Sequence, residues 1–159
     1  MLRLVLVAIL LAGCRISLED GSSGQVCQVG TSPACQDAVN HSDLAWIEEN
    51  VFKPSCIFSG CHNGDNNLQG KIDLRGGQSH AHLVNVASVI DTTRKLVVPN
   101  DVQASYLMLM LQDLPPAMAN PPASPPPGSV GFMPQGGGPL CCQKLDALER
   151  WIMAGAPSM

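Results

Sequence analysis

The sequence has 159 residues, which is enough for one domain with a modest core. Its formal net charge is −4 and it carries no basic patch, so nucleic acid is not an expected partner. Only 4% of the residues are aromatic, and a core so poor in large side chains gains stability from a cofactor or from cross-links.

The first thirteen residues carry one positive charge followed by an unbroken apolar run. That run is too short to span a bilayer comfortably and predicts a signal peptide in residues 1–13. It ends in Leu11-Ala12-Gly13-Cys14, which resembles the lipobox of bacterial lipoproteins. The resemblance implies cleavage before Cys14 and lipid on Cys14, whereas an incidental cysteine after a short signal peptide is the alternative.

Residue 15 is arginine and not the aspartate associated with inner-membrane retention in some bacteria. We therefore expect a protein of the bacterial cell envelope that associates with the membrane through lipid on Cys14. The outer membrane is favoured over the inner one, with the protein facing the periplasm or the cell surface.

Residues 14–40 are rich in Gly, Ser, Gln and Thr without a periodic apolar pattern, which predicts a flexible tether. In an oxidising compartment, Cys27 and Cys35 are the expected disulfide partners because they bracket a short Gly/Pro loop. Cys141 and Cys142 are adjacent, and a bridge between them would be strained, so one of them is expected to reach elsewhere. Residues 41–159 form the predicted head.

A first helix is predicted after a cap at Asn40 or Ser42. Pro54 ends it just before Cys56, so the helix leads directly into a cysteine-containing loop. The apolar residues at helical spacing are Leu44, Ile47 and Val51.

The loop holds Cys56, Cys61 and His62 within seven residues, the last two adjacent. In c-type haem attachment two cysteine sulfurs add to the haem vinyl groups, and the histidine after the second cysteine becomes the proximal iron ligand. The usual spacer has two residues and this one has four. A longer loop can still span both vinyl groups, and the adjacency of Cys61 and His62 is intact. The motif therefore predicts one covalent haem c per chain.

Two other interpretations remain open for this motif. In an exported chain Cys56 and Cys61 can be disulfide partners, with His62 an ordinary loop residue. A zinc site is also conceivable, but zinc usually takes four protein ligands, and the sequence has no second compact Cys/His pair at finger-like spacing.

The middle of the chain alternates polar turns with short apolar segments. Asn100 or Asp101 is expected to open a helix, in which Met108 and Met110 are interpreted mainly as core residues. The expected elements are a short helix or extended piece through 82–84, an extended segment at 96–99 and a helix through 104–111.

Residues 113–139 contain nine of the thirteen prolines and five glycines, which predicts a long irregular surface loop. The loop ends shortly after Met133 and Pro134.

A last helix is predicted to begin near Leu140 or Cys142. Gly155 and Pro157 stop that helix. Its residues at helical spacing are Leu145, Leu148 and Ile152.

Five short motifs then occur in a fixed order. They are Pro54-Ser55-Cys56, Leu96-Val97-Val98-Pro99, Ser105-Tyr106-Leu107, Met133-Pro134 and Trp151-Ile152-Met153-Ala154-Gly155-Ala156. With them, residues 42–157 resemble a monohaem class I cytochrome c domain of exported bacterial proteins. The resemblance implies an all-α cytochrome c-like domain with crossed N- and C-terminal helices and a long Pro/Gly-rich loop. It also implies that Met133 approaches the iron from the side opposite His62.

The sequence therefore predicts a lipid-anchored c-type cytochrome that carries single electrons to a redox partner protein. Met133 is preferred as the second iron ligand because it stands in a Gly/Pro setting before the last helix. Pro134 also restricts Met133 to an extended backbone that can hold the side chain inward. The other candidates are Met118, Met108, Met110, His80 and His82.

An enzyme is not expected, because the sequence shows no Ser/His/Asp set, no convincing carboxylate pair and no phosphate-binding glycine loop. The alternative function is a haem-free lipoprotein of the same fold, stapled by disulfides and acting as a structural or interaction module. In that alternative, Cys56 or Cys61 joins Cys141 or Cys142.

Overall fold

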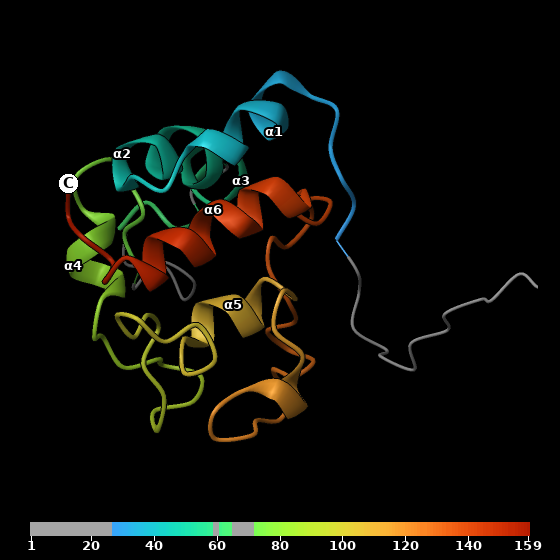
Figure 1. Ribbon diagram of the computed structural model, residues 1–159. Coiled ribbons are helices and arrows are strands. Elements are labelled where there is room, and N and C mark those ends of the chain that lie inside the picture. The colour runs from blue at the N-terminus through green and yellow to red at the C-terminus, as the bar shows by residue number, and fades with distance from the viewer. Residues whose placement is uncertain (1–26, 59–60, 65–71) are drawn as a thin grey trace, which may run out of the picture.

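The computed structural model describes residues 27–58, 61–64 and 72–159, so the predicted signal peptide and Cys14 lie outside the described residues. Its helical elements, in chain order, are α1 (Pro33–Asp37), η1 (Ala38–Asn40), α2 (Leu44–Ile47), η2 (Glu48–Phe52), α3 (Lys53–Ser55), α4 (Ser79–Leu83), α5 (Tyr106–Met110), η4 (Pro116–Met118) and α6 (Cys142–Met153). Figure 1 shows these short helices joined by long loops.

The domain is broadly helical. Within the described ranges the extended segments form isolated β-bridges and no named strand. Val97 of the expected extended segment bridges Val84, and its amide donates to the Leu83 carbonyl at 3.1 Å. None of the helices in the described part is long and apolar enough to cross a membrane.

The first helical run extends from α2 through η2 to α3 and stops at Ser55, so the predicted end before Cys56 is confirmed. Its cap is not Asn40 or Ser42. The Asp43 carboxylate takes that role by accepting a hydrogen bond from the Trp46 amide at 2.8 Å. A carboxylate can reach an unpaired amide of the first turn from this position. The predicted inward residues Leu44, Ile47 and Val51 are all buried.

The last helix is confirmed as α6. It ends before Gly155, whose φ of 92° is a left-handed conformation that glycine adopts without steric cost. The helix packs against α1, η1 and α2, and Figure 1 shows it passing across the N-terminal helices. Its buried residues are Leu145, Ala147, Leu148, Trp151 and Ile152.

The expected tether is wrong for residues 27–40. They form α1 and η1, and two disulfides attach them to the start of α6. The expected bridge between Cys27 and Cys35 is also wrong, because the observed pairs are Cys27 with Cys142 and Cys35 with Cys141. Both adjacent cysteines of α6 thus reach elsewhere. Cys35 is buried in α1, which packs on α6, and this packing brings the pairs together.

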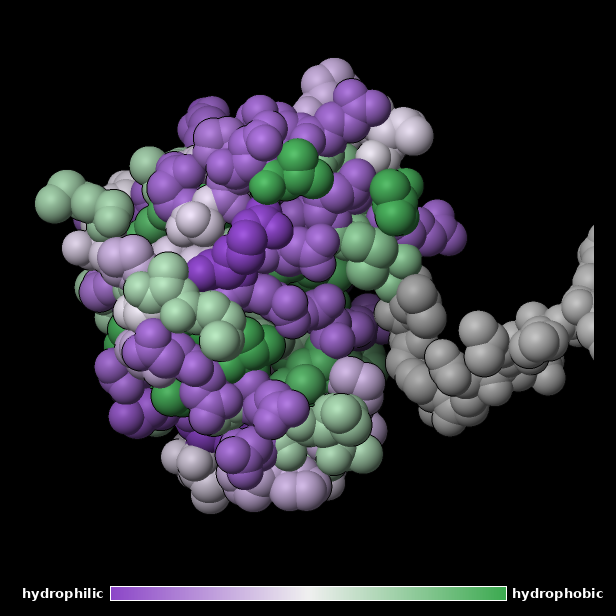
Figure 2. All heavy atoms as spheres, viewed as in Figure 1, coloured by the Kyte–Doolittle hydropathy of each residue, from purple (hydrophilic) through white to green (hydrophobic). Residues whose placement is uncertain are grey.

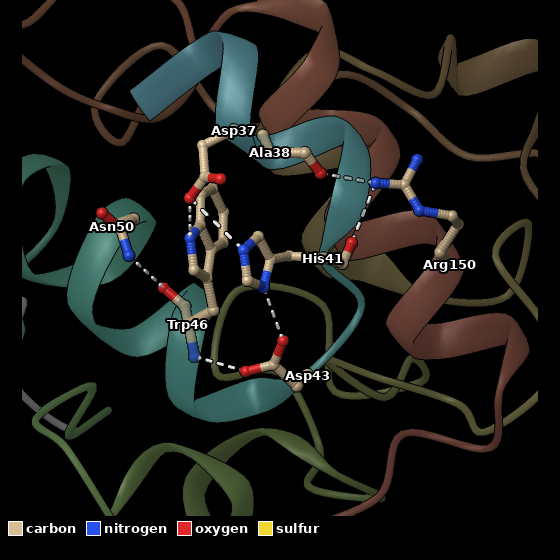
Figure 3. A network of polar contacts seen from close by, with 7 residues as sticks. All are labelled: Asp37, Ala38, His41, Asp43, Trp46, Asn50 and Arg150. Carbon is tan, nitrogen blue, oxygen red and sulfur yellow. Dashed lines mark hydrogen bonds and ion pairs between the residues drawn. The ribbon is translucent and has the colours of Figure 1, made fainter. Parts of the chain in front are cut away.

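A polar network ties the same region together (Figure 3). The His41 imidazole stacks on the Trp46 indole, with ring centroids 4.7 Å apart and planes 9° from parallel. Its ring nitrogens lie 3.3 Å from an Asp37 oxygen and 2.9 Å from an Asp43 oxygen. Arg150 of α6 donates to the His41 carbonyl at 2.8 Å. The network therefore joins η1 and α2 to the last helix.

The helix expected through 104–111 begins later than predicted, at Tyr106. Asp101 accepts a hydrogen bond from the Ala104 amide, and the Ser105 hydroxyl donates to the Asp101 carbonyl at 2.6 Å. These bonds stabilise a turn instead of a first helical turn, because short polar side chains compete with the helix for backbone groups.

The Pro/Gly-rich loop is irregular apart from η4, as predicted. Arg94 holds it in place. Its side chain is 6% exposed, and it donates to the carbonyls of Pro121 and Pro122 and to the Asp91 carboxylate.

Figure 2 shows a mainly hydrophilic surface over the helices, with hydrophobic residues showing in the hollows of the lower half.

Candidate cofactor-binding cleft

The cysteine-histidine loop closes on itself after α3. The Cys56 amide donates to the Phe52 carbonyl at 2.7 Å, and the His62 amide donates to the Cys56 carbonyl at 3.1 Å. The His62 carbonyl then accepts from the Leu74 amide at 2.9 Å. These backbone bonds keep Cys56 and His62 near each other despite the four-residue spacer.

The loop forms one part of the wall of a cleft. Other parts are the end of the first helical run, the segment from Ser88 to Ile90, α5 and the segment from Met133 to Gln135. The empty space of the cleft, its open mouth included, is about 980 Å³. Among the described residues that line it, none is Asp, Glu, Lys or Arg. The cleft therefore suits a mainly apolar ligand.

All four predicted binding residues line this cleft: Cys56, Cys61, His62 and Met133. Met133 comes from a segment far away in the sequence. Its amide donates to the Met110 carbonyl at 2.8 Å, and this bond attaches the end of the Pro/Gly-rich loop to α5. The structure thus brings two thiols, an imidazole and a thioether to one space.

Cys56 and Cys61 carry thiols and belong to neither disulfide. The bridge expected in the haem-free alternative, from one of them to Cys141 or Cys142, is therefore wrong, because those two are already paired. Burial, helped by the neighbouring Cys61 and opposed by Lys144, raises the pKa of the Cys56 thiol to about 12. Cys56 is consequently held in its protonated form at neutral pH.

Of the other residues that the sequence offered as a second iron ligand, one lies in the cleft lining and the others lie outside it. Met108 and Met110 are both buried in the core, as expected, and Met110 also lines the cleft. Met118 is 58% exposed and does not line the cleft. His80 and His82 also lie outside the lining, and the His80 Nε2 is 3.1 Å from the Ala156 carbonyl oxygen.

The sequence named Met110 as one of several candidate ligands but gave no reason to prefer it over Met108. Two methionines two residues apart point to different sides of a helix, so the two side chains were expected to meet different surroundings. Which one faces a cleft depended on the packing of α5. In the part of the chain that the structure describes, no three His, Cys, Asp or Glu side chains are grouped to hold a metal ion.

No protein-family model, curated protein or solved structure matches this chain. A function must therefore follow from the cleft and from the four predicted binding residues that line it.

Proposed function

We propose that this chain is a c-type cytochrome, an electron carrier with one haem attached in the cleft. The observation that carries the proposal is the convergence of Cys56, Cys61, His62 and Met133 on one space, whose described lining residues include no Asp, Glu, Lys or Arg. These residues come from two segments that are more than 70 residues apart, so their meeting is not a local effect of sequence.

The four residues that meet in the cleft have the chemistry that a covalent haem needs. Two thiols suit covalent attachment, while an imidazole and a thioether suit ligation of iron. The apolar walls suit a macrocycle and would exclude water from it. When bound, haem c would supply one-electron chemistry by cycling iron between its ferric and ferrous states.

Each residue has a separate role in the proposal. Cys61 would offer an attachment point next to His62, which would hold the imidazole as an iron ligand. Cys56 would offer the second attachment point across the longer loop. Met133 would supply a weak sulfur donor, which would favour ferrous iron and a higher potential than two histidines would. The domain would then be an all-α cytochrome c-like fold in which the N- and C-terminal helices cross.

Anchoring forms a second part of the proposal. Lipid on Cys14 would hold the head at the bacterial cell envelope, where a redox partner protein docks briefly. Several acyl chains acting together give stable anchoring, since each buried CH₂ contributes about 0.8 kcal/mol. Cys14→Ser should release the head from the membrane fraction or block processing. Unchanged fractionation and cleavage of the variant would contradict this part alone.

The central test uses protein matured in a host with c-type haem assembly. We expect a Soret band that survives acid–acetone extraction, and an intact mass that includes one haem. Cys61→Ala or His62→Ala should abolish mature holoprotein, whereas Cys56→Ala should leave some singly attached haem. A wild-type mass without the haem increment, two protons lighter for each disulfide, would instead favour a haem-free module stapled by the two observed bridges.

A further inference from the structure

A π-turn lies in the helical run that leads to the cleft. η2 spans Glu48–Phe52, and the Lys53 amide donates to the Glu48 carbonyl five residues earlier. The Ile57 amide likewise donates to the Phe52 carbonyl, at 3.1 Å. A π-turn inserts one extra residue into a helix, and such turns are frequent at functional sites.

The sequence supplies a physical cause for this irregularity. In a regular α-helix the amide of residue 54 would donate to the carbonyl of Asn50. Residue 54 is proline, which has no N–H and whose ring clashes with the carbonyl four residues earlier. Proline and π-bulges are established causes of helix distortion. Residue 54 therefore cannot donate to the Asn50 carbonyl, which accepts a hydrogen bond from another part of the chain.

That donor is Lys144 of α6. Its Nζ donates to the Asn50 carbonyl oxygen at 2.6 Å, across 94 residues of sequence. Lys144 is half-buried and lies two residues after Cys142, where a disulfide attaches α6 to the N-terminal segment. The bond therefore connects the π-turn to a well-anchored helix.

The π-turn determines which way Cys56 faces. At about 100° per residue, an unbroken α-helix would place Cys56 about 120° around the axis from Leu44. One extra residue sets the following residues back by about 100°, which leaves Cys56 within about 20° of Leu44. Leu44 and Val51 are buried on that face, and Cys56 lines the cleft.

We propose that Lys144, together with Pro54, is a positioning residue for Cys56. The Lys144 ammonium holds the Asn50 carbonyl, and the π-turn maintained in this way directs the Cys56 thiol into the cleft. The use of this thiol for haem attachment rests on the proposed function, but its orientation does not.

The test measures thiol orientation in protein produced without haem and kept under non-reducing conditions. Iodoacetamide is added at a fixed pH, and peptide mass spectrometry follows the alkylation of Cys56 relative to Cys61. Because both thiols are in the same molecule, Cys61 serves as an internal reference. Lys144→Met should raise the Cys56 to Cys61 ratio several-fold, since the released thiol turns toward solvent.

Two further variants serve as controls. Lys144→Arg keeps a donor for the Asn50 carbonyl and should keep the wild-type ratio. Lys53→Met removes an exposed lysine of the same helical run, whose Nζ pairs with Glu49 at 2.5 Å, and should also leave the ratio unchanged. An unchanged or lower ratio in Lys144→Met overturns the proposal. Loss of a nearby positive charge alone would lower the ratio, because the thiolate is the reacting form.

Pro54→Ala provides an independent test if Lys144→Met does not fold. It restores the missing amide and removes the ring clash, so the run should return to a regular helix with no loss of thermal stability. The Cys56 to Cys61 ratio should still rise, and an unchanged ratio overturns the proposal. Absence of covalent haem from matured wild-type protein would refute the proposed function only, since these alkylation ratios are measured on haem-free protein.

Discussion

Cys27 is bonded to Cys142 across 115 residues of sequence, and Cys35 is bonded to Cys141 directly beside it, across 106 residues. Two adjacent cysteines at the start of α6 therefore hold the N-terminal segment at two points. The Gln143 side chain adds hydrogen bonds to both the amide and the carbonyl of Gly30, at 3.0 and 2.9 Å. α6 also packs on α1, η1 and α2, so this attachment is part of the helical core.

Removal of one bridge should destabilise the domain strongly. For Cys27→Ser with Cys142→Ser we expect a loss of about 2–4 kcal/mol in the free energy of unfolding, because the unfolded chain regains the freedom that a long closed loop removes. Guanidinium titration under non-reducing conditions measures the loss. A non-reducing peptide map that linked Cys27 to Cys35 would contradict the observed pairing.

Gly30 leaves room for the second bridge. A Cβ at this position would lie 2.5 Å from the Cys35 Sγ and 2.8 Å from the Cys141 Cβ. Gly30→Ala should therefore cost about 1–3 kcal/mol through overpacking, measured by thermal or denaturant unfolding. Gly128→Ala is the matched control, since a Cβ there meets nothing within 4 Å. Equal stability of the two variants would show that the segment around Gly30 can shift without cost.

Asp43 should stabilise the first helix as its cap. Asp43→Ala is expected to cost about 1 kcal/mol in the free energy of unfolding, whereas Asp43→Asn keeps a capping oxygen and should cost less. The hydrogen bond from His41 holds the pKa of the Asp43 carboxyl below its ordinary value. The Asp43 charge therefore stabilises the fold fully at pH values above the ordinary carboxyl pKa. This contribution is lost as the pH falls through the lowered pKa. Denaturant unfolding of both variants near neutral pH and in acid checks the ranking, and equal losses would argue against the cap.

Asp113 should make the fold less stable as the pH rises. Burial, together with the neighbouring carboxyls of Glu149 and Asp146, raises its pKa to about 7. Between the ordinary value of 3.8 and about 7, the folded state keeps a proton that the unfolded state has lost, so stability falls across this range. Asp113→Asn should flatten that fall and melt at a higher temperature than wild type near pH 8.

Melting temperatures at several pH values from about 4 to 8 check this behaviour. Glu49→Gln removes an exposed carboxyl that is paired with Lys53, and it should leave the pH dependence as in wild type. If the melting temperature fell equally with rising pH in Asp113→Asn and in wild type, another group would be responsible for the pH dependence.

Met133 can be tested as the second iron ligand of the proposed cytochrome. Met133→Leu keeps the side-chain volume but removes the sulfur, so the near-infrared sulfur-to-iron band of the ferric protein should disappear while covalent haem remains. The potential should fall as well, because the thioether favours ferrous iron. Met118→Leu is the control, since Met118 is 58% exposed and outside the cleft. If the band persisted in Met133→Leu, Met110 would be the next residue to test, because it also lines the cleft.

The sequence by itself determined the first and last helices, because the signals act over a few residues. Leu44, Ile47 and Val51 have the spacing of one helix face, and all are buried. Pro54 and Gly155 likewise mark where each helix stops. The cysteine-histidine motif was also visible, since its residues are close in the chain.

Only the tertiary structure decided the disulfide pairing and the full lining of the cleft. Cys27 and Cys35 are near neighbours in sequence, yet each bonds to α6, because α1 packs on that helix. Met133 reaches the cleft through a backbone bond to Met110, and no local pattern encodes such a bond. The direction of Cys56 depends on a π-turn whose carbonyl is held by a lysine from the last helix. Contacts between distant segments form only where the packed core brings them together, so local sequence signals do not reveal them.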